Sequence, residues 1–194
     1  INKYLKIKKN YIGKYLVDDD TCILNIRGGE YKSHSDLILP KSYWINAMEN
    51  MRKMTDVKKF IIVTDDKQYA ENLIPGLQVI SGSIPASYLT IYNARFCILS
   101  NSSFPYFAIK TGIQPEIVIA PKFFCRFNSP LNRWASPCNV YRDWYYQDRD
   151  GIVYNYEHCK QLTEEVINKY ETEYVLLCKR NQFPKKNILK KIMP

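Results

Sequence analysis

Histidine, glycine and closely spaced cysteines are scarce in this sequence. Only two histidines and seven glycines occur among its 194 residues, and no two cysteines are spaced as Cys-x-x-Cys. The six cysteines are Cys22, Cys97, Cys125, Cys138, Cys159 and Cys178. A zinc site needs clustered thiolates or imidazoles, so we predict no bound metal.

The cysteines instead divide into core and loop positions. Cys22, Cys97 and Cys178 lie in apolar runs, where a thiol packs as a small core side chain. Cys125 and Cys138 flank a loop and would pair only in an oxidising compartment, which the sequence does not decide.

Membrane-spanning and nucleic-acid-binding patterns are also missing. No transmembrane or signal-peptide segment is visible, and no nucleic-acid motif accompanies the net charge of +9, so we expect no nucleic-acid partner. The basic residues gather before residue 15 and after residue 178. That charge suits a polyanionic small ligand or an anionic membrane surface, although a lysine-rich composition without functional meaning explains most of it.

Five short apolar runs alternate with helical patterns between residues 21 and 121. The predicted strands are 21–27, 59–64, 77–80, 96–99 and 116–120, and the predicted helices are 41–54, 66–74, 85–94 and 103–111. Alternation of this kind predicts a parallel sheet with right-handed crossovers. The expected fold class is therefore α/β, a Rossmann-like parallel sheet with flanking helices.

We expect three parts in the chain. Residues 1–20 are predicted to be an N-terminal helical segment that links to a preceding part. Residues 21–121 form the Rossmann-like domain. Residues 122–194 are expected to form an irregular, aromatic-rich extension with a helix at about 160–171, a strand at about 173–178 and a basic tail. Its aromatic residues either shape an acceptor groove or serve ordinary packing.

Polar residues follow four of the predicted strands directly. They are Arg27-Gly28-Gly29, Asp65-Asp66, Ser81-Gly82-Ser83 and Asn101-Ser102-Ser103. The carboxyl ends of parallel strands meet at one edge, which is where such sheets bind ligands. Ser102 and Ser103 also begin a helix, whose free N–H groups favour phosphate, so Arg27 facing them would clamp a diphosphate. Taken singly, each motif is explained as a solvated strand end, a helix cap or a glycosylation sequon.

Five segments, in their order and spacing, match the pattern of a known enzyme family. They are Asn25–Tyr31, Leu39–Trp44, Val63–Asp66, Ile98–Phe104 and Val118–Lys122. Together they resemble the alpha-1,2-fucosyltransferases over about residues 21–122. The resemblance implies that this chain is the donor-binding half of a GT-B glycosyltransferase. It implies inverting transfer of fucose, or a related sugar, from GDP-fucose or another nucleotide sugar to a hydroxyl of a glycan, without a metal or other cofactor.

The resemblance also assigns roles to residues. Arg27 would contact the donor diphosphate and assist the leaving group. Apart from the resemblance, the acceptor hydroxyl needs a base, and Glu30 is the nearest candidate in this chain, although an ordinary turn carboxylate has the same sequence pattern and the base could lie in a preceding part. The expected binding residues are Asn25, Arg27, Gly28, Asp65, Asp66, Ser102, Ser103 and Phe104. The chain departs from the family pattern at Asn25, Gly28 and Glu30, where the family has histidine, arginine and aspartate.

Those departures motivate an alternative, a non-catalytic nucleotide- or glycan-binding module on the same fold. The expected partners are a nucleotide sugar and a glycan acceptor, with peripheral membrane association as one option. The expected location is the cytoplasm or the membrane periphery of a bacterium, or the Golgi membrane of a eukaryote. The sequence fixes no oligomeric state.

Overall fold

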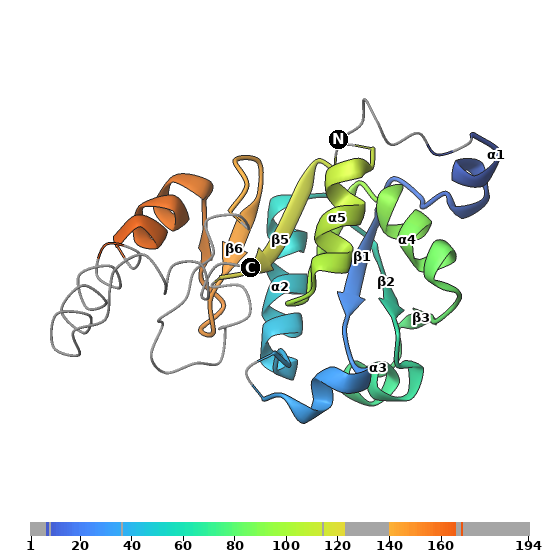
Figure 1. Ribbon diagram of the computed structural model, residues 1–194, viewed down its shortest axis with the longest axis horizontal. Coiled ribbons are helices and arrows are strands. Elements are labelled where there is room, and N and C mark those ends of the chain that lie inside the picture. Colours follow the sequence, from blue (N-terminus) through green and yellow to red (C-terminus); the bar gives the residue numbers. More distant parts are fainter. Residues whose placement is uncertain are drawn as a thin grey trace, which may run out of the picture.

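A seven-stranded sheet with helices on both faces forms the framework of the protein (Figure 1). The computed structural model describes residues 7, 9–35, 37–113, 115–122, 140–165 and 168. The strands are β1 (Thr21–Ile26), β2 (Lys59–Thr64), β3 (Gln78–Ile80), β4 (Phe96–Ile98), β5 (Ile117–Pro121), β6 (Tyr145–Gln147) and β7 (Val153–Tyr154). The fold class is therefore α/β, as the sequence predicts.

The strand order creates a natural binding edge. The order is β3-β2-β1-β4-β5-β6-β7, and every neighbouring pair is parallel except β6 with β7. The chain moves outward from β1 to β3 on one side and restarts at β4 on the other. The point where the order reverses lies between β1 and β4, and ligands of open α/β sheets bind outside the carboxyl ends of the strands there.

The sheet separates two hydrophobic cores, and helices cover both of them. Helices α2 (Lys41–Met54) and α3 (Lys67–Leu73) pack on one face of the sheet. Helices α4 (Ile84–Tyr92) and α5 (Ser103–Thr111) pack on the other, together with a helix at 156–165. Shorter turns are α1 (Lys9–Ile12), η1 (Gly13–Tyr15) and η2 (Gly29–Ser33).

The central strand is buried along its whole length. All six residues of β1 are buried because neighbouring strands and both helical layers surround it. Its side chains alternate between the two cores, with Leu24 on the α2 side and Ile23 on the α5 side. Cys22 and Cys97 are buried free thiols, as expected, and burial raises the pKa of both well above its ordinary value.

The main correction concerns the segment after residue 121. It was expected to be irregular, but β6 adds to β5 in parallel and β7 pairs with β6, so the sheet does not end at the expected domain boundary. The closing helix begins at 156 rather than at about 160. The predicted strand at 173–178, the basic tail, Cys125, Cys138 and Cys178 lie outside the described residues.

The N-terminal prediction is tested only in part. Residues 9–15 are helical, as expected, while 1–6 and 8 lie outside the described residues. The turn after β1 continues into η2. Within the described part of the chain, no helix has the length and apolar character that crossing a membrane requires.

Candidate functional site

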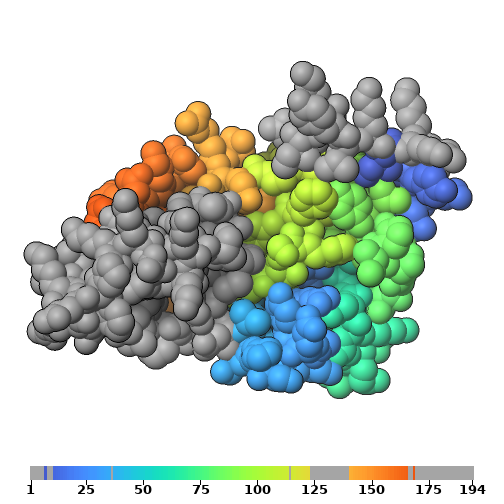
Figure 2. All heavy atoms as spheres, in the orientation of Figure 1, coloured from blue at the N-terminus to red at the C-terminus, as the bar shows by residue number. Residues whose placement is uncertain are grey.

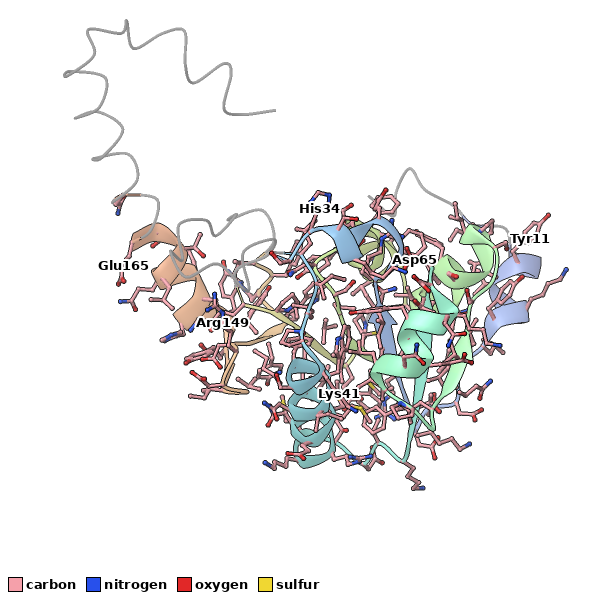
Figure 3. The ribbon with its side chains drawn as sticks, turned by 90° about the horizontal axis from the view of Figure 1, so that it is seen from below. Tyr11, His34, Lys41, Asp65, Arg149 and Glu165 are labelled. Atoms are coloured by element: carbon pink, nitrogen blue, oxygen red, sulfur yellow. The ribbon has the colours of Figure 1, made fainter. Side chains whose placement is uncertain are left out.

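The polar strand ends do gather at the carboxyl edge of the sheet. The η2 turn follows β1 and lies against the start of α3, as Figure 2 shows where the blue and teal surfaces meet. Figure 3, seen from below, shows Asp65 near the η2 end of the molecule, where His34 is also labelled. The predicted proximity of Arg27 and the Asp65-Asp66 pair is confirmed.

Arg27 is held by two carboxylates. Its Nη1 lies 2.8 Å from Oδ2 of Asp65, and its Nη2 lies 3.1 Å from Oε1 of Glu30. The guanidinium also stands over the ring of Tyr31, with 5.0 Å between its central carbon and the ring centroid. The Arg27 side chain remains 31% exposed, whereas its Nε is buried and has no hydrogen-bond partner among the described residues.

Asp65 and Asp66 anchor the glycine turn. Gly28 N–H donates to Oδ1 of Asp65 at 2.9 Å, and Gly29 N–H donates to Oδ2 of Asp66 at 3.3 Å. Asp66 also caps α3 by accepting from Tyr69 N–H at 3.1 Å. Hydrogen bonds from the Lys32 ammonium and from the backbone N–H groups of Tyr69 and Gly29, together with the positive charge of Lys32, hold the pKa of Asp66 below its usual range. The two aspartates thus fix the loop that carries Arg27.

Gly28 has a packing role that its sequence context does not reveal. A Cβ at this position would lie 2.7 Å from Cβ of Asp66 and 2.9 Å from Cδ1 of Tyr69. The next residue, Gly29, has φ +44°, in the left-handed region that favours glycine. The close approach of the η2 turn to α3 therefore leaves no room for a larger side chain at position 28.

Asn25 ties three strand ends together. Its Nδ2 donates to the backbone oxygen of Val63 on β2 at 3.3 Å, and its Oδ1 accepts from the Ser100 hydroxyl after β4 at 2.8 Å. Asn25 is 5% exposed. These contacts connect β1 to the end of β2 and to the segment that precedes α5. Asn25 is therefore a buried structural residue rather than a group open to a ligand.

The elbow between β4 and α5 presents one exposed hydroxyl. Ser102 is buried and caps α5 by accepting from Phe104 N–H at 3.4 Å, whereas Ser103 is exposed. Asn101 is fully buried and donates to the backbone oxygen of Leu37 at 3.2 Å, which rules out glycosylation of this sequon in the folded protein. Phe104 is half-buried, with its ring 6.1 Å from that of Tyr88.

Arg27 and the elbow share the edge without touching. Within the described residues, the hydrogen bonds and ion pairs of Arg27 go to Glu30 and Asp65, and none goes to the elbow. The arginine cluster contains two cations, Arg27 and Lys32, and the three carboxylates of Glu30, Asp65 and Asp66. Its net charge is therefore −1, from two minus three.

Two basic residues near this edge were given no role from the sequence. Lys32 pairs with Asp66 at 2.5 Å and Lys122 follows β5, with its ammonium 3.4 Å from the ring centroid of Tyr154. Lys122 is only 9% exposed, and this burial lowers its pKa. Lys122 belongs to the segment Val118–Lys122 of the sequence resemblance. Its burial, however, depends on Tyr154 of β7, a strand that the sequence does not predict.

Neither metal ligation nor a known relative identifies the site. Among the described residues, no three histidine, cysteine, aspartate or glutamate side chains gather where a metal ion could bind. Comparison of the chain with models of protein families, with curated proteins and with solved structures gives no match. The chemistry of the carboxyl edge must therefore be judged from its own residues.

Proposed function

We propose that this chain binds a nucleotide sugar and forms the donor-binding half of a GT-B glycosyltransferase. The enzyme would transfer fucose, or a related sugar, from a GDP-sugar to a glycan hydroxyl with inversion. This proposal rests on the resemblance of the sequence to alpha-1,2-fucosyltransferases and on one structural observation. Arg27, at the end of β1, and the α5 elbow, after β4, flank the point where the strand order reverses.

The two flanking groups have the chemistry that a diphosphate requires. Arg27 can place Nη2 on a phosphate oxygen while Nη1 stays on Asp65, which gives one charge-assisted contact. The start of α5 lies at the same edge and presents the exposed Ser103 hydroxyl there, whereas Phe104 N–H already donates to Ser102 and Pro105 has no N–H. Charge that develops on the departing nucleoside diphosphate would be met by these fixed donors.

The ion pairs of Arg27 define how a donor would enter. Glu30 is 73% exposed and its bond to Arg27 lies at the surface, where ion pairs contribute only about 0–1 kcal/mol. A phosphate can replace Glu30 on Nη2 while Asp65 keeps Nη1 in position. Glu30, once released, would lie beside the bound donor, which is where a catalytic base is required.

The net negative charge of the arginine cluster favours a second candidate, the non-catalytic binding module. A cluster with more carboxylates than cations is a poor phosphate site unless Glu30 moves away. A neutral glycan would not need that displacement. The two functions differ in whether a nucleotide binds and whether a sugar is transferred.

The test is a thermal-shift screen of the full chain against GDP, UDP, CDP and ADP, followed by turnover of GDP-fucose with a glycan acceptor. The proposal predicts stabilisation that is largest with GDP, because ligands that bind only the folded state raise its melting temperature. It also predicts release of GDP during turnover. Binding of GDP without product would support a non-catalytic nucleotide-binding module. No response to any nucleotide would contradict the glycosyltransferase and would leave only the glycan-binding form of the module.

A further inference from the structure

A cavity lies at the opposite edge of the sheet from the proposed donor site. It has a volume of about 420 Å³, within the roughly 300–1,000 Å³ range of ligand pockets. Its lining comes from the start of β5, the approach to β6 and the start of the helix at 156–165. The polar and aromatic side chains of the lining include Glu116, Arg142, Asp143, Tyr145, Asn155, Tyr156 and Glu157.

The sheet itself separates this cavity from Arg27. The cavity lies at the amino ends of β5 and β6, whereas the donor site lies at the carboxyl ends of β1 and β4. A strand rises about 3.3 Å per residue, so the five residues of β5 alone place the two edges about 13 Å apart.

The charges around the cavity nearly balance. The lining has three carboxylates, on Glu116, Asp143 and Glu157, and one guanidinium, on Arg142. Glu116 is bound by Arg95 at 2.6 Å, and the charge of Lys110 acts on Asp143, which leaves Glu157 with Arg142. The hollow therefore has no excess of positive charge that would attract a phosphate or a nucleotide.

The same lining suits a ligand rich in hydroxyl groups. The half-buried rings of Tyr145 and Tyr156 line the cavity, and the Arg142 guanidinium stands over the Tyr156 ring, with 6.0 Å between its central carbon and the ring centroid. The ring surface that Arg142 and the core leave uncovered would pack on the apolar C–H side of a sugar ring. Asp143, Asn155 and Glu157 are exposed and offer planar acceptors and donors that match neighbouring hydroxyls. Asn155 also accepts from His158 N–H at 3.0 Å, which fixes its orientation.

We propose that this amino-edge cavity is a second binding site, which takes a neutral glycan and is separate from the donor site. Tyr156 would stack on a sugar ring, and Asp143 and Glu157 would accept hydrogen bonds from its hydroxyls. Such a site would hold a long glycan away from the transfer chemistry. It stands on the cavity alone and does not require that the donor proposal be correct.

The test measures binding of lactose, N-acetyllactosamine and maltose to the full chain by saturation-transfer NMR and calorimetry. At least one of these neutral sugars should bind the unmodified chain weakly. Tyr156→Ala and Asp143→Ala should each weaken that binding about tenfold, the usual effect of losing one strong polar or packing contact. Glu164→Ala, an exposed change on the same helix, should leave it unchanged.

Two further measurements separate the possible outcomes. Circular dichroism establishes that each variant is folded, and saturating GDP or Arg27→Ala should not alter sugar affinity if the sites are independent. Absence of binding by all three sugars, or equal affinity in the folded cavity variants, would overturn the proposal. Tight binding of a nona-lysine peptide that displaces the sugars would also overturn it and would identify the cavity as a site for basic peptides.

Discussion

At the scale of single residues, Arg27 is a cation with two carboxylate partners and a partly exposed side chain. Asp65 fixes the guanidinium through Nη1 and also holds the backbone of Gly28. Glu30 contacts Arg27 through the Nη2 group of the guanidinium, and the Glu30 side chain is largely exposed. We infer that Asp65 positions Arg27, whereas Glu30 competes with any anion that approaches it.

Glu30→Gln should strengthen GDP binding. The change removes one negative charge and releases Nη2 of Arg27, so affinity should rise several-fold, the effect expected for a partly exposed charge contact of about 1 kcal/mol. Calorimetry measures it, with Glu71→Gln on the exposed face of α3 as the control. If Glu30 is also the base, the same variant should lose transfer while it binds GDP more tightly. Unchanged or weaker GDP binding would show that Glu30 does not compete for the site.

Gly28→Ala should destabilise the fold. The added methyl would overlap atoms of Asp66 and Tyr69, and overpacking of this kind typically costs about 1–3 kcal/mol. Gly82→Ala is the matched control, since its Cβ would meet its nearest neighbour at an ordinary 3.6 Å. Urea unfolding compares the two. Equal unfolding free energies would mean that η2 does not pack closely against α3.

Asp66→Asn should change how stability depends on pH. Folding lowers the pKa of Asp66, so its carboxylate contributes stability above the unfolded value of about 3.9, and that contribution is lost as pH falls through the folded pKa. The variant should be less stable near pH 7 and should lose less stability on acidification. Urea unfolding from pH 7 to pH 2 measures this, with the exposed Asp56→Asn as control. Parallel profiles for Asp66→Asn and the unmodified chain would contradict it.

At the scale of secondary structure, a buried polar contact attaches the β6–β7 hairpin to α2. Gln147 is fully buried, donates to the backbone oxygen of Tyr43 at 2.9 Å and accepts from Nδ2 of Asn50 at 2.9 Å. Asn50 also donates to the backbone oxygen of Gly151 at 2.8 Å. These contacts hold in place the two strands that extend the sheet beyond β5.

Asn50→Ala should therefore loosen the hairpin. It leaves buried acceptors without their donor, which costs about 1–3 kcal/mol of unfolding free energy. Asn72→Ala, on the exposed surface of α3, should stay within about 0.5 kcal/mol of the unmodified chain. Urea unfolding gives the totals, and hydrogen exchange should be faster at the β6 amides in the first variant only. Unchanged exchange there would show that α2 does not hold the hairpin.

Elements with long regular patterns were predictable from the sequence. Helix α2 matches its predicted bounds because Pro40 precedes it and apolar side chains recur at helical spacing along one face. Strands β6 and β7 were not predicted, since they have three and two residues and the buried Gln147 interrupts any apolar run. Sheet pairing, rather than local sequence, determines such short strands.

The candidate site was predictable in its position but not in its contacts. The strand ends lie at one edge, as parallel strands require. The pairing of Arg27 with Asp65 depends on β1 and β2 being neighbours, and the sequence does not fix strand order. The overlap that Gly28 avoids likewise depends on how closely η2 approaches α3.

At the scale of the whole molecule, one sheet presents two chemically different edges. The carboxyl edge has Arg27 and the start of α5, and the amino edge has a tyrosine-lined cavity whose charges nearly balance. At the carboxyl edge, Arg27 is proposed to bind the donor diphosphate.

The most direct test is the affinity of GDP for Arg27→Ala, measured by calorimetry on the folded full chain. Loss of a charged contact to phosphate should weaken binding roughly 10- to 100-fold. Arg149→Ala, in the turn between β6 and β7, should bind GDP like the unmodified chain. Equal GDP affinity in Arg27→Ala and the unmodified chain would contradict the account.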